Sequence, residues 1–266
     1  MMHEKERHSA ILQAVKDRPV VTIEELVSLT ESSEATVRRD IVALHAQNRL
    51  RRVRGGAEAI NQPHLAGTPF TVNAMKNIAA KRAVAKAAVE LCQDGEPIII
   101  NGGTTTYQMV HYLTHRIMPV FTNSFPIAEY LLKHSKNVVT LPGGTIYREQ
   151  NIILSPFEND MTQNFSAKRM FTSTQAISPF GIMESDPLLI LAEQKLLSQA
   201  EELIVLADSS KFKTHSSLVL CKLSRISMII TDSGIDEREA AIVRDAGIEL
   251  KIVDVAIDQK ESSLSA

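Results

Sequence analysis

The chain has 266 residues, of which 44% are hydrophobic and 23% charged, and its formal net charge at pH 7 is −2. This length accommodates two modest domains with a core each, and the composition excludes a largely disordered chain. The sequence has no apolar run of the ~18 residues that a membrane span requires and no signal-peptide pattern at its charged N-terminus, so we expect a cytoplasmic protein.

The first sixty residues begin with a predicted helix from Glu4 to about Lys16, which has apolar residues at helical spacing. The residues from Thr22 to Glu25 form a capping box, so a second helix starts there and continues to about Leu29. Three residues separate its end from Ser33, which is suited to cap a third helix. Two helices joined by so short a turn indicate a helix-turn-helix over about residues 20–39.

The third helix has two different faces. Val37, Ile41 and Leu44 share the apolar face, whereas Arg38 and Arg39 point the other way. Adjacent arginines on the outer face suit the major groove of DNA, where a guanidinium can donate two hydrogen bonds to guanine or bind a phosphate. Taken alone, the same pattern also fits an ordinary solvated helix face.

An arginine-rich hairpin follows this helix. Two short runs, Leu50–Arg54 and Ala57–Ile60, flank Gly55-Gly56, a pair typical of a two-residue hairpin turn. From Thr36 to Gly56 six arginines stand against one aspartate, which concentrates positive charge where a phosphate backbone would lie. The pattern predicts a winged helix-turn-helix at residues 1–60. Its candidate DNA-binding residues are Ser33, Glu34, Thr36, Arg38, Arg39, Arg51, Arg52, Arg54, Gly55 and Gly56.

Residues 61–72 contain two prolines and a glycine without clear periodicity, and we expect a linker there. Residues 73–256 alternate helices with short apolar strands, the pattern of an α/β domain with a mainly parallel sheet. One helix is predicted from about Asn73 to Leu91, and another, capped by Asp186, continues to about Ala200. The strands are predicted at Pro97–Asn101, Met118–Asn123, Val138–Leu141, Arg169–Ser173, Leu203–Ala207, Met228–Thr231 and Leu250–Val253. Residues 257–266 are expected to be a frayed tail.

Polar or glycine-rich residues follow several of these strands, at the edge where ligands of such sheets bind. In Asn101–Thr106 two glycines would let backbone amides approach an anion, and three hydroxyls can donate. Similar turns follow at Thr122–Ser124, Pro142–Thr145 and Ala207–Lys211. Each could be a plain turn, but four of them at one edge of a sheet favour a shared pocket.

The segments TVRRDIVAL (36–44) and LRRVRGGAEAI (50–60) resemble the signature of the DeoR family of bacterial sugar-metabolism repressors, and the resemblance extends over nearly the whole chain. It implies a winged helix-turn-helix and a sensor domain similar to ribose-5-phosphate isomerase. In that domain the loop Gly102–Thr106 and Lys211 would hold the phosphate of a sugar. The chain departs from the family pattern at Glu31, where a turn glycine is common, at Ser32, and at Asn101, where many members have aspartate.

Within the sensor domain, Phe171–Gln175 and Ala192–Lys195, together with Asn101, resemble the branch typified by the ascorbate-6-phosphate repressor. The sheet-edge turns and the resemblance together give the candidate effector-binding residues. These are Asn101, Gly102, Gly103, Thr104, Thr105, Thr106, Asn123, Gly143, Gly144 and Lys211.

These features favour a transcriptional regulator that binds double-stranded operator DNA as a homodimer or homotetramer. By the resemblance it would repress a carbohydrate uptake or catabolic operon until a phosphorylated sugar releases it. The alternative is a sugar-phosphate isomerase with an added DNA-binding head, which would need a carboxylate base. The isomerase-like loop Ser173–Gln175 contains no acid, although Glu184, Asp186 and Glu193 follow it. A purely architectural DNA-binding protein would not need the α/β domain, so we expect a regulator and not an enzyme.

We expect neither a metal nor a cofactor. Cys92 and Cys221 belong to no CxxC pair and are better explained as buried apolar side chains than as disulfide partners or metal ligands. His111 and His115 have the i, i+4 spacing of helical metal ligands, but the glutamate of an HExxH motif is missing between them.

Overall fold

The structure is a computed structural model that describes residues 2–17, 21–47, 49–53, 55–58 and 70–255. Its contacts divide the chain into two compact units, residues 1–64 and residues 65–266. Each unit has an apolar core of its own.

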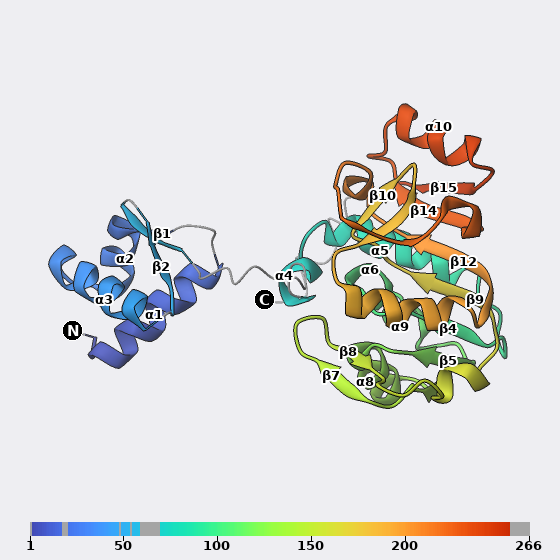
Figure 1. The fold of residues 1–266 in the computed structure, drawn as a ribbon, viewed down its shortest axis with the longest axis horizontal. Helices are drawn as coiled ribbons and strands as arrows, with labels where there is room; N and C mark the ends of the chain where they lie inside the picture. Colours follow the sequence, from blue (N-terminus) through green and yellow to red (C-terminus); the bar gives the residue numbers. More distant parts are fainter. Residues whose placement is uncertain (1, 18–20, 48, 54, 59–69, 256–266) are drawn as a thin grey trace. The chain divides into compact units, whose positions relative to one another are not determined.

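The described part of the N-terminal unit combines three helices with a small antiparallel sheet (Figure 1). Its elements are α1 (Glu4–Asp17), β1 (Val21–Thr22), α2 (Ile23–Thr30), α3 (Glu34–Ala46), β2 (Arg51–Val53) and β3 (Gly56–Glu58), with the strands in the order β1-β3-β2. Ile11, Leu26, Val37 and Leu44, which come from all three helices, are fully buried in its core. The apolar face predicted for the third helix is therefore confirmed.

Both predicted helix starts in this unit are confirmed. The Glu25 amide donates to Thr22 Oγ1 over 3.3 Å and the Thr22 amide donates to Glu25 Oε2 over 2.9 Å, which completes the capping box. Ser33 Oγ accepts a hydrogen bond from the Thr36 amide at 3.3 Å and starts α3. In the turn between α2 and α3, Glu31 has a φ of 49°, a left-handed conformation that glycine adopts at lower cost.

The hairpin is confirmed, but Gly56 is not part of its turn. β2 and β3 pair antiparallel with Val53 opposite Gly56, so Gly56 belongs to β3. β1 runs along the other side of β3, and a Cβ atom on Gly56 would lie 2.2 Å from the carbonyl oxygen of Val21. Glycine is required here because two backbones approach closely, not because the chain turns.

A seven-stranded sheet forms the centre of the C-terminal unit. Its strands lie in the order β15-β14-β12-β9-β4-β5-β6, and every neighbouring pair is parallel. The strands are β4 (Ile98–Ile100), β5 (Pro119–Thr122), β6 (Val138–Thr140), β9 (Ala167–Thr172), β12 (Ala200–Leu206), β14 (Met228–Asp232) and β15 (Glu249–Val253). All seven strands predicted from the sequence are confirmed.

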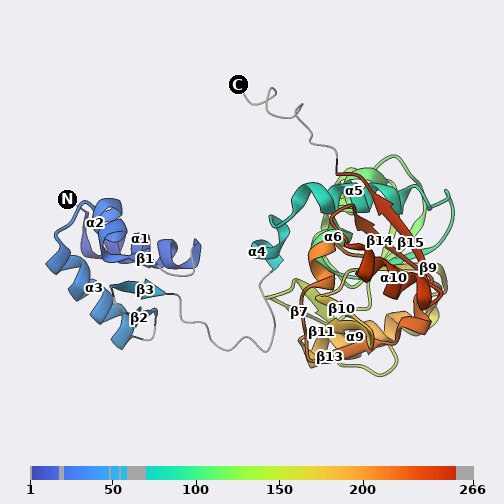
Figure 2. The same ribbon diagram turned by 90° about the horizontal axis from the view of Figure 1, so that it is seen from above.

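Helices cover both faces of this sheet (Figure 2). One face packs against α5 (Ile78–Val89), α7 (Val110–Leu113) and α8 (Phe125–His134), and the other against α9 (Pro187–Leu197) and α10 (Glu237–Asp245). In β4, Ile98 and Ile100 face the first group and Ile99 faces the second. The strand is buried on both sides, which explains why it is apolar at every position.

Two of the predicted helices and the predicted linker need correction. The helix predicted from Asn73 to Leu91 is in fact two helices, α4 (Phe70–Ala74) and α5, because the chain breaks at Asn77, where φ is 52°. α9 ends at Leu197, and Ala200 is already the first residue of β12. Since α4 starts at Phe70, the linker cannot extend to residue 72. Residues 61–69 and the predicted tail at 257–266 lie outside the described residues.

The sequence did not predict two small antiparallel sheets. β7 (Thr145–Tyr147) pairs with β8 (Ile152–Leu154), and β11 (Gly181–Glu184) pairs with β10 (Ala176–Ser178) and β13 (Leu218–Cys221). The short helices are α6 (Thr104–Tyr107) and the 3-10 helices η1 (Met161–Asn164), η2 (Ser209–Phe212) and η3 (Leu223–Arg225). Cys92 and Cys221 are free thiols; Cys92 is buried, as predicted, whereas Cys221 is half-buried.

Candidate functional site

The arginines predicted to contact DNA lie on the surface of α3 and β2. Arg38, Arg39, Arg51 and Arg52 are all exposed, and Arg54 lies outside the described residues. Arg38 donates to Glu34 Oε1 over 2.6 Å, and Arg51 forms an ion pair with Glu58. Arg39 and Arg52 form no ion pair with any residue that the structure describes, so their guanidinium groups remain available to a ligand.

The aspartate between these arginines is turned inward. Asp40 is 6% exposed, and its carboxylate accepts hydrogen bonds from Arg7 Nε at 2.6 Å and Arg7 Nη2 at 3.1 Å, with His8 Nε2 also 3.1 Å away. Burial alone would raise the pKa of Asp40, but the hydrogen bonds from Arg7 and His8 lower it below its ordinary value. Asp40 therefore anchors α3 to α1, and its charge is compensated inside the unit.

The remaining DNA-binding candidates divide into surface and buried positions. Ser33 Oγ and Thr36 Oγ1 lie 2.9 Å apart at the start of α3, beside the exposed Glu34. Gly55 is exposed and has a φ of 83°. Gly56 is buried between β1 and β2, where the close approach of the strands requires glycine, and its predicted contact with DNA stays a prediction.

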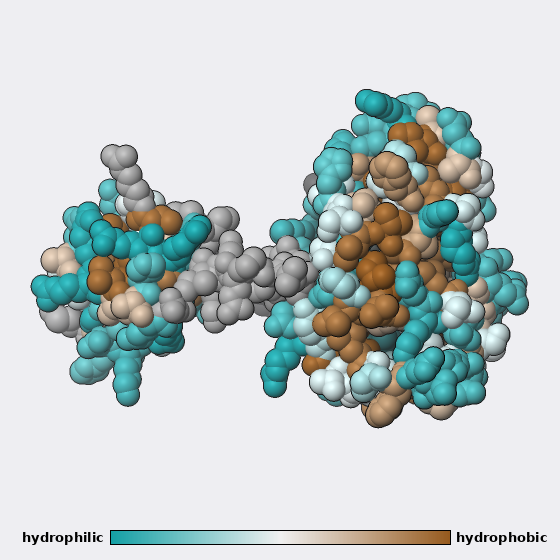
Figure 3. Space-filling model, viewed as in Figure 1, coloured by the Kyte–Doolittle hydropathy of each residue, from teal (hydrophilic) through white to brown (hydrophobic). Residues whose placement is uncertain are grey.

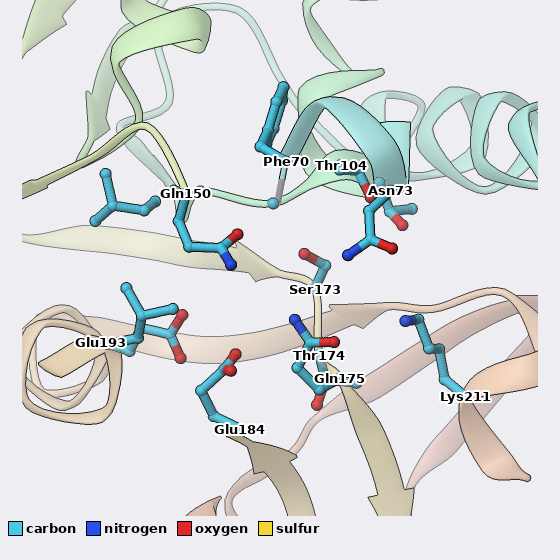
Figure 4. A pocket seen from close by; sticks show the side chains of 15 residues that line it. Phe70, Asn73, Thr104, Gln150, Ser173, Thr174, Gln175, Glu184, Glu193 and Lys211 are labelled. Atoms are coloured by element: carbon cyan, nitrogen blue, oxygen red, sulfur yellow. The ribbon is translucent and has the colours of Figure 1, made fainter. Parts of the chain in front are cut away.

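A cavity opens in the C-terminal unit at the carboxyl ends of β4 and β9. From β4 the chain continues to β5 and β6 on one side, whereas from β9 it continues to β12, β14 and β15 on the other. Ligands of parallel α/β sheets bind at such a reversal of strand order. The cavity has a volume of about 550 Å³, including space open to solvent. It is lined by Phe70, Asn73, Gly102, Gly103, Thr104, Thr105, Gln150, Ile152, Ser173, Thr174, Gln175, Glu184, Leu189, Glu193 and Lys211 (Figure 4).

One end of this cavity suits an anion. Figure 4 shows Lys211, Asn73 and Thr104 together on one side of it. The neighbouring loop runs very close to other lining residues, because a Cβ atom on Gly103 would lie 1.7 Å from Ser173 Oγ. A cation, hydroxyl groups and a glycine loop that leaves backbone amides accessible are groups that bind phosphate in proteins.

The other end of the cavity is acidic. Glu184 comes from β11 and Glu193 from α9, and they are 7% and 5% exposed. Burial and the nearby charge of Glu184 raise the pKa of Glu193 to about 8, and burial also raises the pKa of Glu184. Gln150 lies on the same side (Figure 4).

Two predicted effector-binding residues, Asn101 and Asn123, lie behind the cavity rather than in it. Asn101 is fully buried; its Nδ2 donates to Glu193 Oε1 over 2.8 Å and to Thr172 Oγ1 over 2.9 Å. Asn123 Nδ2 donates to Asn101 Oδ1 over 2.9 Å, and Asn123 Oδ1 accepts from the Gly102 amide at 2.8 Å. The two asparagines therefore orient the glycine loop and Glu193.

Three further effector-binding predictions are not among the cavity-lining residues. Thr106 is buried, and its hydroxyl donates to the Gly103 carbonyl oxygen over 3.1 Å, which stabilises the loop. Gly143 and Gly144 precede β7, and a Cβ atom on Gly144 would lie 2.2 Å from the Leu154 carbonyl oxygen of β8. Gly144 therefore permits a close approach to β8, and of the predicted set only Gly102, Gly103, Thr104, Thr105 and Lys211 line the cavity.

Several residues that line the cavity were not predicted from the sequence. Phe70 and Asn73 belong to α4, which falls partly within the predicted linker, and Gln150 lies in the turn of an unpredicted hairpin. Glu184 and Glu193 were considered only as possible catalytic acids. Ser173, Thr174 and Gln175 could have been found, because they directly follow a predicted strand at the same sheet edge.

Two family models match the chain: the DeoR-like helix-turn-helix domain over residues 7–63 and the DeoR C terminal sensor domain over residues 76–233. The chain belongs to the DeoR family. The exposed arginines lie in the DeoR helix-turn-helix domain, and the cavity lies in the sensor domain apart from Phe70 and Asn73, which precede its matched residues.

Named relatives of this DeoR-family protein are regulators. It is 34% identical over 230 residues to the HTH-type transcriptional regulator UlaR of Shigella dysenteriae serotype 1 (strain Sd197), which covers 86% of this chain and 91% of that protein. UlaR of Escherichia coli (strain K12 / DH10B) matches with the same identity and coverage. The chain is therefore a DNA-binding transcriptional regulator with a sensor domain, and not an enzyme.

Solved structures with a similar arrangement include ribose 5-phosphate isomerase A from Methanocaldococcus jannaschii. It is 17% identical, with a TM-score of 0.38, over 50% of this chain and 53% of that chain. The Neisseria gonorrhoeae enzyme is 18% identical, with a TM-score of 0.37, over 52% of this chain and 54% of that chain. Both are distant likenesses of fold.

Two kinds of feature are absent from the described residues. None of their helices is both long and apolar enough to cross a membrane. The same residues contain no group of three or more histidine, cysteine or acidic side chains that could hold a metal ion. His111, whose spacing from His115 is that of helical metal ligands, has its Nδ1 3.1 Å from the Tyr130 hydroxyl.

Proposed function

We propose that this DeoR-family regulator represses a carbohydrate uptake or catabolic operon in the cytoplasm, and that a phosphorylated sugar bound in the sensor cavity releases it from DNA. The observation that supports the proposal best is the division of the cavity into two ends. Lys211, hydroxyl groups and the glycine loop suit a phosphate, whereas Glu184, Glu193 and Gln150 suit sugar hydroxyls. The resemblance to ascorbate-6-phosphate repressors makes ascorbate 6-phosphate the first effector to test.

The N-terminal unit would contact the operator with α3 and the hairpin. Arg39 is exposed and unpaired among the described residues, so it can donate to a guanine edge in the major groove. Arg52 and the hydroxyls at the start of α3 are suited to phosphates, which fix the register without selecting sequence. Arg38 and Arg51 would first exchange their carboxylate partners, Glu34 and Glu58, for DNA phosphates.

Helix α4 could transmit ligand binding in the cavity to the chain that precedes the sensor domain. Phe70 and Asn73 line the cavity, and α4 is the first described element after residue 58. Its position is set by a few contacts: the Phe70 amide donates to the Glu149 carbonyl oxygen over 3.0 Å, and the Phe70 ring lies edge-on to Tyr107 at 5.8 Å. A ligand that prefers one position of α4 would change where the chain leaves the sensor domain.

We expect the regulator to act as a homodimer or homotetramer, because helix-turn-helix proteins commonly bind two half-sites of an operator. Figure 3 shows apolar side chains gathered on the face of the sensor domain on which α9 lies. On α9, Leu188 and Leu191 are 52% and 63% exposed. Exposed apolar patches of this kind mark association surfaces. Sedimentation of the full chain would give its oligomeric state, and a monomer at micromolar concentration would contradict this expectation.

The test of the regulatory function is a gel-shift on DNA upstream of the protein's own gene and neighbouring sugar operons. Ascorbate 6-phosphate and common pentose and hexose phosphates are added in turn, with the unphosphorylated sugars as matched controls. We expect one phosphorylated compound to release the DNA and its unphosphorylated counterpart to have no effect. Release by both forms would refute the phosphate assignment, and DNA binding that no compound alters would refute the proposed effector class.

A further inference from the structure

The outer face of α3 is mainly apolar at its centre. The inner face of this helix is buried in the core of the N-terminal unit. With about 3.6 residues per turn, four residues point directly away from that core. This outer stripe consists of Ala35, Arg39, Val42 and Ala46. All four are exposed, Val42 by 47%, and three of them are apolar, although the outer face of a surface helix is normally polar.

The charged side chains of α3 leave the outer stripe with a single charge. Beside the stripe, Glu34 Oε1 accepts a hydrogen bond from Arg38 Nη2 at 2.6 Å. Asp40 is turned inward and is bound by Arg7. Arg39 is therefore the one charged residue of the stripe. Isolated exposed apolar residues are common, but apolar residues on both sides of a cation along one helix indicate a partner that offers apolar groups and hydrogen-bond acceptors.

The major groove of DNA offers both kinds of group. Guanine presents two acceptors to a guanidinium group, and thymine presents a methyl group that small apolar side chains contact. α3 belongs to the DeoR-like helix-turn-helix domain, and the second helix of such a motif enters the groove. The exposed Arg38, Arg51 and Arg52 add positive charge that complements the DNA phosphates. DNA is therefore the partner that fits the outer stripe.

The spacing along α3 matches the spacing of base pairs. About two helical turns separate Ala35 from Val42, which corresponds to about 10.5 Å along the helix axis. Successive bases of B-DNA are ~3.4 Å apart, so this distance covers about three base-pair steps when the helix follows the groove. Arg39 lies between the two apolar residues. The stripe can therefore contact two thymine methyl groups about three steps apart, with a guanine between them.

We propose that Ala35 and Val42 contact thymine methyl groups of the operator on either side of a G·C pair that Arg39 contacts. This inference rests on the proposed contact of α3 with the operator. Contacts with phosphates fix the position of the protein but select no sequence, whereas a methyl contact distinguishes thymine from cytosine, which has no methyl group at that position. Ala35 and Val42 are thus residues that determine which operator the regulator selects.

Deoxyuridine tests the methyl contacts, because it pairs with adenine as thymine does but lacks the methyl group. The probe is the duplex that the full-length protein enriches from random sequences. Each of its thymines is replaced in turn by deoxyuridine, and affinities are measured by gel-shift titration. We expect two positions at which deoxyuridine weakens wild-type binding about fourfold, the factor for burial of one methylene-sized group.

Variants assign these positions to side chains. In Val42→Ala the ratio of thymine to deoxyuridine affinity should fall toward one at one of the two positions, and in Ala35→Gly at the other. Val42→Ile should retain the preference. The matched control is Leu29→Ala on α2, where Leu29 is 48% exposed, and it should leave both ratios unchanged. Because each ratio compares two duplexes with the same variant, a change in protein stability does not affect it.

Equal binding of the thymine and deoxyuridine duplexes by the wild type at every position would overturn the proposal. So would a preference that survives in both Val42→Ala and Ala35→Gly, or an enriched duplex without thymine. Arg39→Ala on the same duplex tests the contact of α3 with DNA separately. If it weakens binding while no position prefers thymine, the methyl contacts are refuted and the α3 contact stands. If neither Arg39→Ala nor Val42→Ala alters binding, the α3 contact itself is refuted.

Discussion

Replacing Glu193 by glutamine should stabilise the sensor domain by an amount that grows with pH. In the folded chain burial and the charge of Glu184 raise the pKa of Glu193 from 4.5 to about 8, whereas in the unfolded chain the carboxyl group returns to its ordinary value. Below pH 4.5 it is protonated in both states and does not affect stability. As pH rises from 4.5 to about 8, the unfolded state ionises first, so the free energy of unfolding falls, and above about pH 8 the loss is complete.

The size of this effect follows from the shift. Each pKa unit corresponds to about 1.4 kcal/mol, so the loss has a ceiling of about 5 kcal/mol at high pH and about 3 kcal/mol at pH 7. Glutamine cannot ionise and can still accept the hydrogen bond from Asn101 Nδ2. E193Q should therefore match the wild type near pH 4.5 and exceed its stability increasingly toward pH 8.

The assay is urea unfolding followed by tyrosine fluorescence over this pH range. The chain contains no tryptophan, and all 4 of its tyrosines lie after residue 65. The fluorescence signal therefore reports the unfolding of the sensor domain alone. Glu201→Gln, an exposed substitution on β12, is the matched control and should show the wild-type pH dependence. Parallel wild-type and E193Q curves would refute the reasoning, because they would mean that Glu193 ionises as readily in the folded domain as in the unfolded chain.

Four other changes have defined outcomes. Arg39→Ala should weaken operator binding by ~1 to 3 kcal/mol in a gel-shift titration, with the exposed Arg244→Ala of the sensor domain as control. Lys211→Ala should keep DNA binding but abolish release by the effector; normal release would remove Lys211 from the phosphate site. Glu31→Gly should relieve the φ of 49° and stabilise the helix-turn-helix by up to about 1 kcal/mol, seen as a higher urea midpoint for operator binding. Gly56→Ala should destabilise this unit by about 1 to 3 kcal/mol and lower the same midpoint, because its Cβ would lie 2.2 Å from the Val21 carbonyl oxygen; an unchanged midpoint would contradict the β1–β3 contact.

The helices and strands that could be predicted from the sequence are those marked by residues close to one another in the chain. The capping box at Thr22 and the N-cap at Ser33 set the helix starts through hydrogen bonds that span three residues, and both are present. The buried strands were also recognisable, because a strand covered on both faces is apolar at every position, as in Ile98–Ile100. The order of the strands is not local information, yet it decides that the loops after β4 and β9 meet at one cavity.

The candidate site was predicted only where its residues follow those strands. Glu184 escaped prediction as a ligand-binding residue because β11 lies in a small sheet without a strong hydrophobic pattern, and Gln150 because it lies in a hairpin turn. Asn101 was predicted to bind the effector, but it is not among the residues that line the cavity. A residue at the end of a strand can point into the cavity or behind it, and only the contacts with Thr172, Glu193 and Asn123 show that it points behind.

The proposed coupling between effector binding and DNA binding requires a small free energy, and the contacts that hold α4 contribute free energies of similar magnitude. Allosteric coupling is typically ~1 to 3 kcal/mol, and a single hydrogen bond contributes about 0.5 to 1.5 kcal/mol net. α4 is held by the Phe70 amide on Glu149, by the Phe70 ring on Tyr107, and by the Lys81 ammonium group, which donates to the Asn73 carbonyl oxygen. The cavity face of the same helix is formed by Phe70 and Asn73. A phosphate that binds beside Asn73 and Lys211 would contact α4 through Asn73, so the proposed coupling requires a gain or loss of only one or two of these contacts.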